Sequence, residues 1–223
     1  MQLSPFYKIK NRYYHLMNYR IYFKNHKNKI LAVSFSALAN ILFFAFAIYD
    51  IVLTAPNIDI SGIWNYLLYA VTYLIILIAN IRNDNFAYQG ILMFIFFMVF
   101  DQIYTLLIDS PGLFSSFVSG DLTVICLSIF LFLFLLAQAI IGVLLYLNIA
   151  KYSRGLIDNF KKVRLLGILY SISLFIGLAF YMSLLLLGLE INPFSVFLLF
   201  MTPISEVLMS VAICFTLERL RRI

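Results

Sequence analysis

The sequence predicts an all-α integral membrane protein: a polytopic bundle of six transmembrane helices with both termini on the cytoplasmic side. Hydrophobic residues make up 64% of the chain and charged residues 12%, whereas a soluble domain carries about 25% charged residues. Six apolar stretches are each long enough to cross a hydrocarbon core of ~30 Å at ~1.5 Å per residue. These stretches are residues 30–53, 63–81, 86–108, 122–148, 164–189 and 194–217.

The cations predict the orientation. The chain has 16 Lys and Arg residues, and with the N-terminus inside, all of them fall on one side of the six spans. They lie within residues 8–29, at Arg82, within residues 151–164 and within residues 219–222. Because Lys and Arg are enriched in cytoplasmic loops, this side is predicted to be cytoplasmic. We therefore expect a plasma-membrane protein, bacterial in origin, whose basic surface contacts anionic headgroups rather than nucleic acid.

Residues 1–29 form the main predicted segment outside the spans, and residues 218–223 form a short basic tail. Apolar residues recur at helical spacing at positions 6, 9, 13 and 16, while Lys8, Arg12 and His15 share another face. This pattern is typical of an amphipathic helix lying in the membrane surface. It predicts an anchor that sets topology, with a docking helix for a cytoplasmic partner as the alternative. The basic connection 148–164 offers a second docking segment, for example for a cytoplasmic ATPase.

The three connections on the opposite side each combine an acidic residue with a proline. The prolines are Pro56, Pro111 and Pro193. Because proline lacks an N–H donor, each is expected to end a helix. These connections are too short for an extracellular domain that binds a large ligand.

The informative polar residues are Asp101 in the third span and Glu206 in the sixth. A carboxylate inside hydrocarbon costs at least ~2.5 kcal/mol, and such residues usually face the bundle interior. Counted from the predicted outer ends, Asp101 lies about 10 Å deep and Glu206 about 18 Å deep. No Lys, Arg or His occurs at a comparable depth. The two acids are therefore expected to be protonated, or to face water, a cation or a cationic substrate.

Other polar residues on the spans are candidates for the same substrate- or ion-binding site. Pro203, one turn before Glu206, is expected to kink the sixth span. The candidate liners are Gln102, Tyr104, Thr202, Ser210, Asn40 and Gln138. The alternative is that these side chains only pack the helices together, as small and polar residues often do in membranes.

Enzymatic chemistry is not expected. The two histidines, His15 and His26, lie outside the hydrocarbon, so no intramembrane metal or Ser–His site is predicted. The sequence contains no GxSxG, HExxH, phosphate-loop or GxGxxG motif. Cys126 and Cys214 lie within spans without a CxxC partner, which is typical of buried thiols. No cofactor is predicted.

These observations favour a transporter, or the membrane subunit of a transport complex, that binds a proton, a cation or a small cationic or polar substrate. The arrangement of spans resembles that of ABC-type permease subunits and of vitamin-binding subunits of energy-coupling transporters, although no motif of either group is present. The alternative is a non-transporting membrane module, such as a sensor input bundle or an anchoring subunit. A homo-oligomer is compatible with either function.

Overall fold

In the computed structural model, every described regular element is an α-helix, and six helices follow one another along the chain. They are α1 (Pro5–Thr54), α2 (Ile60–Arg82), α3 (Ala87–Ser119), α4 (Leu122–Ser153), α5 (Phe160–Gly188) and α6 (Pro193–Arg219). The structure describes the backbone of residues 5–54, 60–82, 85–119, 122–156, 159–188 and 193–220. It describes the side chains of residues 26–52, 66–82, 85–108, 122, 125–156, 159–180 and 200–220.

Five helices contain segments long and apolar enough to cross a membrane. These are His26–Val52, Ala87–Ile108, Ile125–Ser153, Phe160–Phe180 and Phe200–Arg219. The corresponding apolar part of α2, Tyr66–Arg82, is shorter within the described residues. The protein is thus all-helical, with the apolar helices of a multi-pass membrane protein. The sixth crossing remains a prediction.

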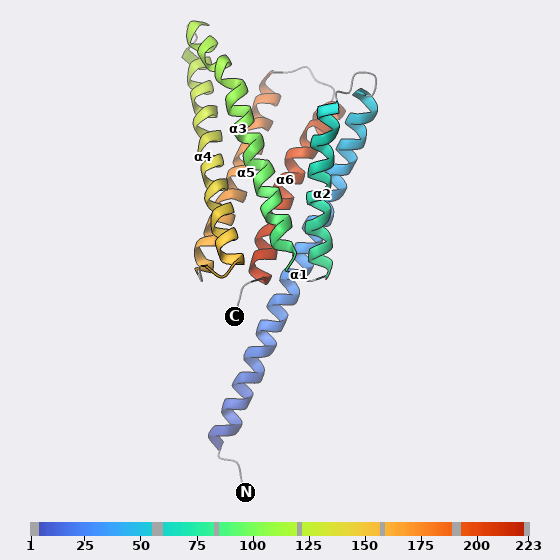
Figure 1. Ribbon diagram of the computed structural model, residues 1–223, viewed down its shortest axis with the longest axis vertical. Helices are drawn as coiled ribbons and strands as arrows, with labels where there is room; N and C mark the ends of the chain where they lie inside the picture. The colour runs from blue at the N-terminus through green and yellow to red at the C-terminus, as the bar shows by residue number, and fades with distance from the viewer. Residues whose placement is uncertain are drawn as a thin grey trace.

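The helices form a ring that follows the order of the chain. Each helix packs against its neighbours in sequence, and α6 packs against α1 to close the ring. Because the helices alternate in direction, the C-terminus and the N-terminal side of the bundle lie at the same end (Figure 1). This closure brings the first and last helices into contact and places α3, α4, α5 and α6 around a common interior.

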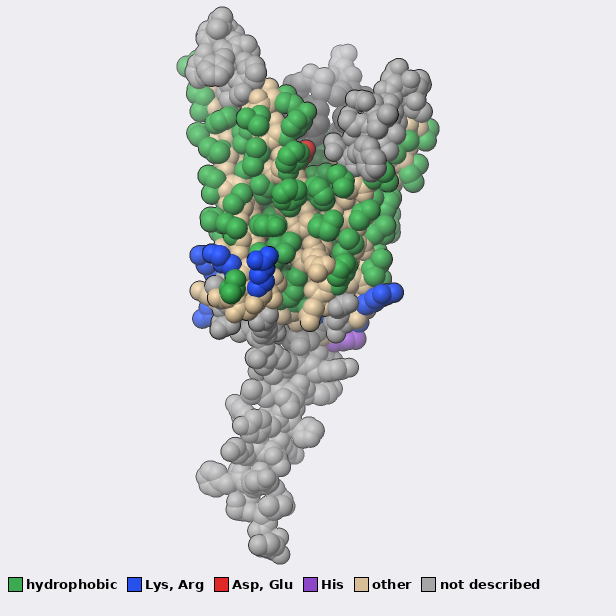
Figure 2. All heavy atoms as spheres, viewed as in Figure 1, with side chains coloured by type: hydrophobic (Ala, Val, Ile, Leu, Met, Phe, Trp, Pro, Cys, Tyr) green, Lys and Arg blue, Asp and Glu red, His purple; other side chains and the backbone are tan. Residues whose placement is uncertain are grey.

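The described Lys and Arg residues gather at the end of the bundle where the termini lie, which we call the cationic end (Figure 2). They are Lys27, Lys29, Arg82, Lys151, Arg154, Lys161, Lys162, Arg164 and Arg219. Above them, hydrophobic side chains cover most of the described surface on the visible face (Figure 2). The charge asymmetry predicted from the sequence is therefore present in three dimensions. The assignment of this end to the cytoplasm stays a prediction.

The first helix extends well beyond the bundle. α1 is continuous over 50 residues, and its N-terminal part projects past the cationic end (Figure 1). The helix thus passes without a break through residue 30, where the sequence places the start of the first span. The side chains of residues 1–25 lie outside the described residues, so the amphipathic face and its position on the membrane surface remain predictions.

Two connections differ from the sequence-based expectation. α3 continues through Pro111 to Ser119, so the prediction that this proline ends the helix at the outer boundary is wrong. Membrane helices tolerate proline because neighbouring groups can satisfy the freed backbone. The connection to α4 is reduced to residues 120–121.

The predicted connection 148–164 is also mostly helical, because α4 extends to Ser153 and α5 begins at Phe160. The end of α4 is fixed by Gly155, whose φ of 75° is in the left-handed region. Gly155 N donates to Tyr152 O at 3.0 Å and Leu156 N to Lys151 O at 2.9 Å. This hydrogen-bond pair is the Schellman arrangement that ends many helices. Only residues 154–159 remain between α4 and α5.

Candidate functional site

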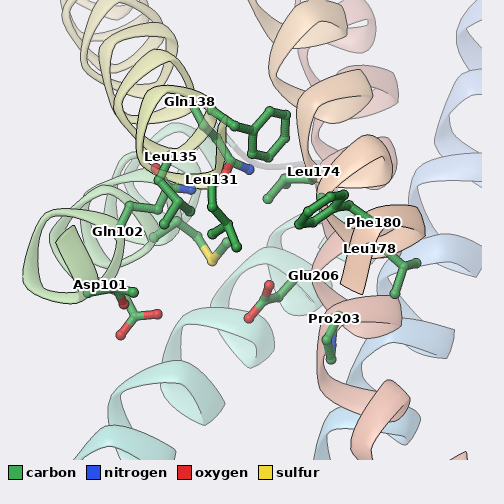
Figure 3. A pocket seen from close by; sticks show the side chains of 14 residues that line it. Asp101, Gln102, Leu131, Leu135, Gln138, Leu174, Leu178, Phe180, Pro203 and Glu206 are labelled. Atoms are coloured by element: carbon green, nitrogen blue, oxygen red, sulfur yellow. The ribbon is translucent and has the colours of Figure 1, made fainter. Parts of the chain in front are cut away.

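A cavity of about 310 Å³ lies between α3, α4, α5 and α6. Figure 3 shows its lining seen from close by. The lining residues are Met98, Asp101, Gln102 and Thr105 of α3, Leu131, Phe134, Leu135 and Gln138 of α4, Leu174, Gly177, Leu178 and Phe180 of α5, and Pro203 and Glu206 of α6. Ligand pockets commonly have volumes of ~300–1,000 Å³ and are mostly apolar with a few polar groups, so this cavity can hold a small molecule.

Helical periodicity explains why these residues meet. On α3 and on α4 the liners recur at intervals of three, four and seven residues, which places them on one face of each helix. The two acids also lie at similar heights along the bundle. Asp101 lies fourteen residues after the start of α3 at Ala87, and Glu206 lies thirteen residues before the end of α6 at Arg219. At ~1.5 Å per residue, both acids stand about 20 Å from the cationic end. The two depths predicted from the sequence differed from each other because the third span was expected to end before Pro111, whereas α3 continues beyond it.

The two acids face the cavity from adjoining parts of its wall. Glu206 is half-buried and Asp101 is more exposed. The two carboxyl groups are close enough for their charges to interact, and the Glu206 side chain extends from α6 toward the side where Asp101 lies (Figure 3). Among the described residues, an ion pair joins Arg164 Nε to Glu218 Oε1 at 2.8 Å. That pair lies at the cationic end, so it does not neutralise the acids of the cavity.

Two glutamines supply the remaining polar part of the lining. Gln102 is 7% exposed and Gln138 is 5% exposed. The Tyr170 hydroxyl lies beside the Gln102 side chain, but that hydroxyl and Gln102 Oε1 are both buried without a partner in hydrogen-bonding geometry. Gln102 Oε1 has almost no accessible surface, so this oxygen does not face the free space of the cavity.

Tyrosines surround the Glu206 side of the cavity. Tyr69, Tyr73 and Tyr170 all lie within electrostatic range of Glu206. The Tyr73 hydroxyl shares a hydrogen bond of 3.3 Å with Ser205 Oγ, and the Tyr69 hydroxyl donates to Met98 Sδ at 3.8 Å. These contacts link α2 to α6 and α3, and they hold the helices that carry the acids.

The structure brings together four of the eight candidate residues, namely Asp101, Gln102, Gln138 and Glu206. The other four are not among the lining residues. Asn40 Nδ2 donates to Tyr73 O at 3.2 Å and joins α1 to α2, and Ser210 Oγ donates to Val207 O at 2.7 Å within α6. Tyr104 is 55% exposed. Thr202 Oγ1 is buried without a partner.

Most of the apolar wall was not identified from the sequence. The missed liners include Leu131, Phe134, Leu135, Leu174 and Phe180. The sequence does contain a signal on α4. Leu131, Phe134 and Leu135 precede Gln138 by seven, four and three residues, so they lie on the same face of the helix as Gln138. In a span that is apolar on all sides, leucine and phenylalanine give no other indication of which face meets a cavity.

A packed core separates the cavity from the cationic end. Each helix that lines the cavity contributes buried core residues nearer that end. They include Ile91, Phe94 and Ile95 of α3, Leu145 and Ile149 of α4, Val163 and Tyr170 of α5, and Met209, Ala212 and Leu217 of α6. Gly142 brings α4 close to Val99 and Tyr170, where a Cβ atom would collide with Val99 Cγ2. The cavity is therefore closed toward the cationic end.

Comparison with known proteins gives no further guide to function, since no family model, no curated protein and no solved structure matches the chain. The class that the fold and the cavity define is an all-helical, multi-pass membrane protein with a mostly apolar cavity that contains two acids and two glutamines.

Proposed function

We propose that the protein binds a proton or a small cation in this cavity and carries it across the membrane, alone or as the membrane subunit of a transport complex. The observation that carries the proposal is that Asp101 and Glu206 face one cavity at the same height in the bundle. Two neighbouring carboxylates without a basic group attract positive charge, and ionisable groups inside a membrane usually mark an ion or substrate pathway.

The sealing of the cavity at one end supports transport rather than a continuous pore. A carrier exposes its site to one side at a time, and here the packed core blocks passage to the cationic end. Opening requires the helices to separate where Val99, Gly142 and Tyr170 meet. α6 contains Pro203 one turn before Glu206, and a proline interrupts the helical hydrogen bonds at the point where a helix can bend.

The experiment is transport into liposomes containing the purified protein, with protons, Na⁺, K⁺ and methylammonium tested separately. The variants are Asp101→Asn and Glu206→Gln, which remove the charge and nearly conserve shape. Glu218→Gln is the matched control, because Glu218 lies at the cationic end and pairs with Arg164. The proposal requires at least one cation to be transported by the wild type and the control but not by the two cavity variants. Unchanged transport in both cavity variants would contradict the assignment of Asp101 and Glu206 as the cation-binding residues.

A second candidate function rests on the projection of α1 beyond the bundle. A helix that projects past the cationic end (Figure 1) offers a surface to a partner protein, and this supports a module that anchors or senses a partner. Co-purification in mild detergent with and without residues 1–25 distinguishes the two. A stoichiometric ATPase lost on truncation favours a transport complex, whereas a kinase or envelope enzyme favours the non-transporting module.

A further inference from the structure

Beside the acid pair Asp101 and Glu206, the cavity has an extended apolar wall, and this wall restricts which cation the cavity can take. The wall is formed by leucine and phenylalanine side chains of α4 and α5, namely Leu131, Phe134, Leu135, Leu174, Leu178 and Phe180. In Figure 3 the side chains of Leu131, Leu135 and Leu174 lie on one side of the two carboxyl groups. The lining is thus divided into a charged part and an apolar part.

The acid pair matches the head of a protonated amine. A primary ammonium has three N–H donors and no acceptor, and ionised carboxylates offer only acceptors. Among the described side chains, no group of three or more His, Cys, Asp or Glu is placed to hold a metal ion. A Ca²⁺ ion takes ~6–8 oxygen ligands, so two carboxylates alone match an ammonium better than such an ion.

The lining disfavours a ligand that carries an acidic group next to its ammonium. None of the described residues that line the cavity is Lys, Arg or His. A carboxylate on the ligand would therefore enter a mostly apolar surrounding without a basic partner, close to Asp101 and Glu206, which carry the same sign of charge. Burying an unpaired charge is costly, and repulsion between like charges adds to that cost. The lining thus matches a simple amine better than an amino acid.

The apolar wall matches a hydrophobic body attached to the ammonium. The volume of about 310 Å³ has room for roughly ten groups of the size of a water molecule, at ~30 Å³ each. A bare ion would leave most of this space to water held against leucine and phenylalanine side chains. Each methylene group that replaces such water is itself removed from solvent, which should tighten binding by about fourfold.

From this arrangement we infer that the cavity binds a hydrophobic monoamine: its ammonium lies at Asp101 and Glu206, and its alkyl or aryl body lies against the leucine and phenylalanine wall. This inference rests on the proposed function, since it names the substrate class of the same site. It predicts that the contributions of the head and of the body to affinity can be removed separately.

The first part of the test varies the body of the ligand. Binding of methylammonium, propylammonium, pentylammonium and Na⁺ to the purified protein in detergent is measured by calorimetry. We expect affinity to rise along the three amines by about fourfold for each added methylene group. Na⁺ should bind more weakly than pentylammonium, because it has no apolar body.

The second part varies the head at a constant body. Phenethylamine is compared with 2-phenylethanol, which replaces the ammonium by a hydroxyl group, and with phenylalanine, which adds a carboxylate. Both should bind at least about tenfold more weakly than phenethylamine, because one lacks the charge-assisted contacts and the other brings an unpaired negative charge. 2-Phenylethanol also reports partition into the detergent micelle, since its apolar body is the same.

Substitutions then assign each part of the ligand to its part of the lining. Glu206→Gln should weaken all three alkylamines by about tenfold or more while keeping the gain for each methylene group. Leu131→Phe fills part of the cavity and should weaken pentylammonium more than methylammonium, and Leu178→Phe provides a second such variant should the first not fold. Leu133→Phe is the matched control, because Leu133 lies on the same helix but is 57% exposed, and it should bind all probes as the wild type does.

The outcomes separate this inference from the proposed function. Equal binding of methylammonium and pentylammonium overturns the inference, and so does binding of 2-phenylethanol or phenylalanine as tight as that of phenethylamine. Equal losses of pentylammonium affinity in Leu131→Phe and Leu133→Phe also overturn it. Binding of Na⁺ alone, or cation transport without amine binding, overturns it as well; if these depend on Asp101 and Glu206, the proposed function stands. If no cation is bound or transported, or if Asp101→Asn and Glu206→Gln change nothing, both proposals fail.

Discussion

Asp101 of α3 and Glu206 of α6 come from helices that are not neighbours in the ring, yet they stand at the same height and face one cavity. More than one hundred residues separate them in sequence. Their meeting depends on two features of the fold: the closure of α6 against α1, and the alternating directions of the six helices.

Neutralising the acids should stabilise the protein in the absence of ligand. A charge with no basic partner in an apolar surrounding raises the free energy of the folded state, and the two carboxylates repel one another. We expect Glu206→Gln to raise the midpoint of thermal unfolding in detergent by about 2–4 °C for each kcal/mol gained. Asp101→Asn should raise it less, because Asp101 is the more exposed of the two. A lowered midpoint in both variants would show that the carboxylates are stabilising in the folded state.

Adding a methyl group at Gly142 should destabilise the core below the cavity. The Cβ atom of Gly142→Ala would collide with Val99 Cγ2 and lie 3.1 Å from Tyr170 Cε2, and such overpacking costs about 1–3 kcal/mol. Thermal unfolding in detergent measures the loss. The double variant Gly142→Ala with Val99→Ala removes the colliding methyl groups and should recover part of it. If the second substitution only adds to the loss, the close approach of α3 and α4 is not where the structure places it.

The hydrogen bond between α6 and α2 should contribute more than bonds made within a helix. Thr216 Oγ1 lies 2.9 Å from Asn80 Oδ1 across the two helices and 2.8 Å from Ala212 O of its own helix, and its one proton is shared between these two acceptors. Thr216→Val leaves the buried amide oxygen without this donor, at a cost of about 1–3 kcal/mol. Thr72→Val is the matched control, since Thr72 Oγ1 donates to Leu68 O of its own helix. Equal losses of thermal stability in the two variants would contradict the interhelical role.

Candidate residues outside the cavity should not affect ligand binding. Tyr104 is exposed and Ser210 is bonded within α6, and neither lines the cavity. Tyr104→Phe and Ser210→Ala should leave the affinity for the transported cation within about twofold of the wild type. A tenfold loss in either variant, measured by calorimetric titration with the transported cation, would extend the site beyond the described lining.

The sequence predicts the fold class well, because span length and charge asymmetry are properties of continuous segments. The positions of Arg82, Lys151 and Arg219 at the cationic end follow directly from that asymmetry. Helix ends are harder to predict. Pro111 signals a stop in water-soluble proteins, but in the structure α3 continues through it to Ser119.

The site is only half predictable for a similar reason. Asp101, Glu206, Gln102 and Gln138 are polar residues in apolar spans, and their chemistry separates them from their surroundings. Asn40 and Ser210 share that property, but they form contacts between or within helices. Leu131 and Phe180 line the cavity without any chemical signal. Only the packing of one helix against another decides between these roles, and a single sequence does not contain it.

The most direct test of the central claim is infrared difference spectroscopy of the carboxyl groups on addition of the bound cation. Bands are assigned to Asp101 and Glu206 by their loss in Asp101→Asn and Glu206→Gln, with Glu218→Gln as the control. If both acids face a cavity that binds cations, both bands shift when the ligand is added. Bands that stay unchanged at every ligand concentration and pH would mean that the carboxyl groups are closed off in a packed core, and would contradict the account.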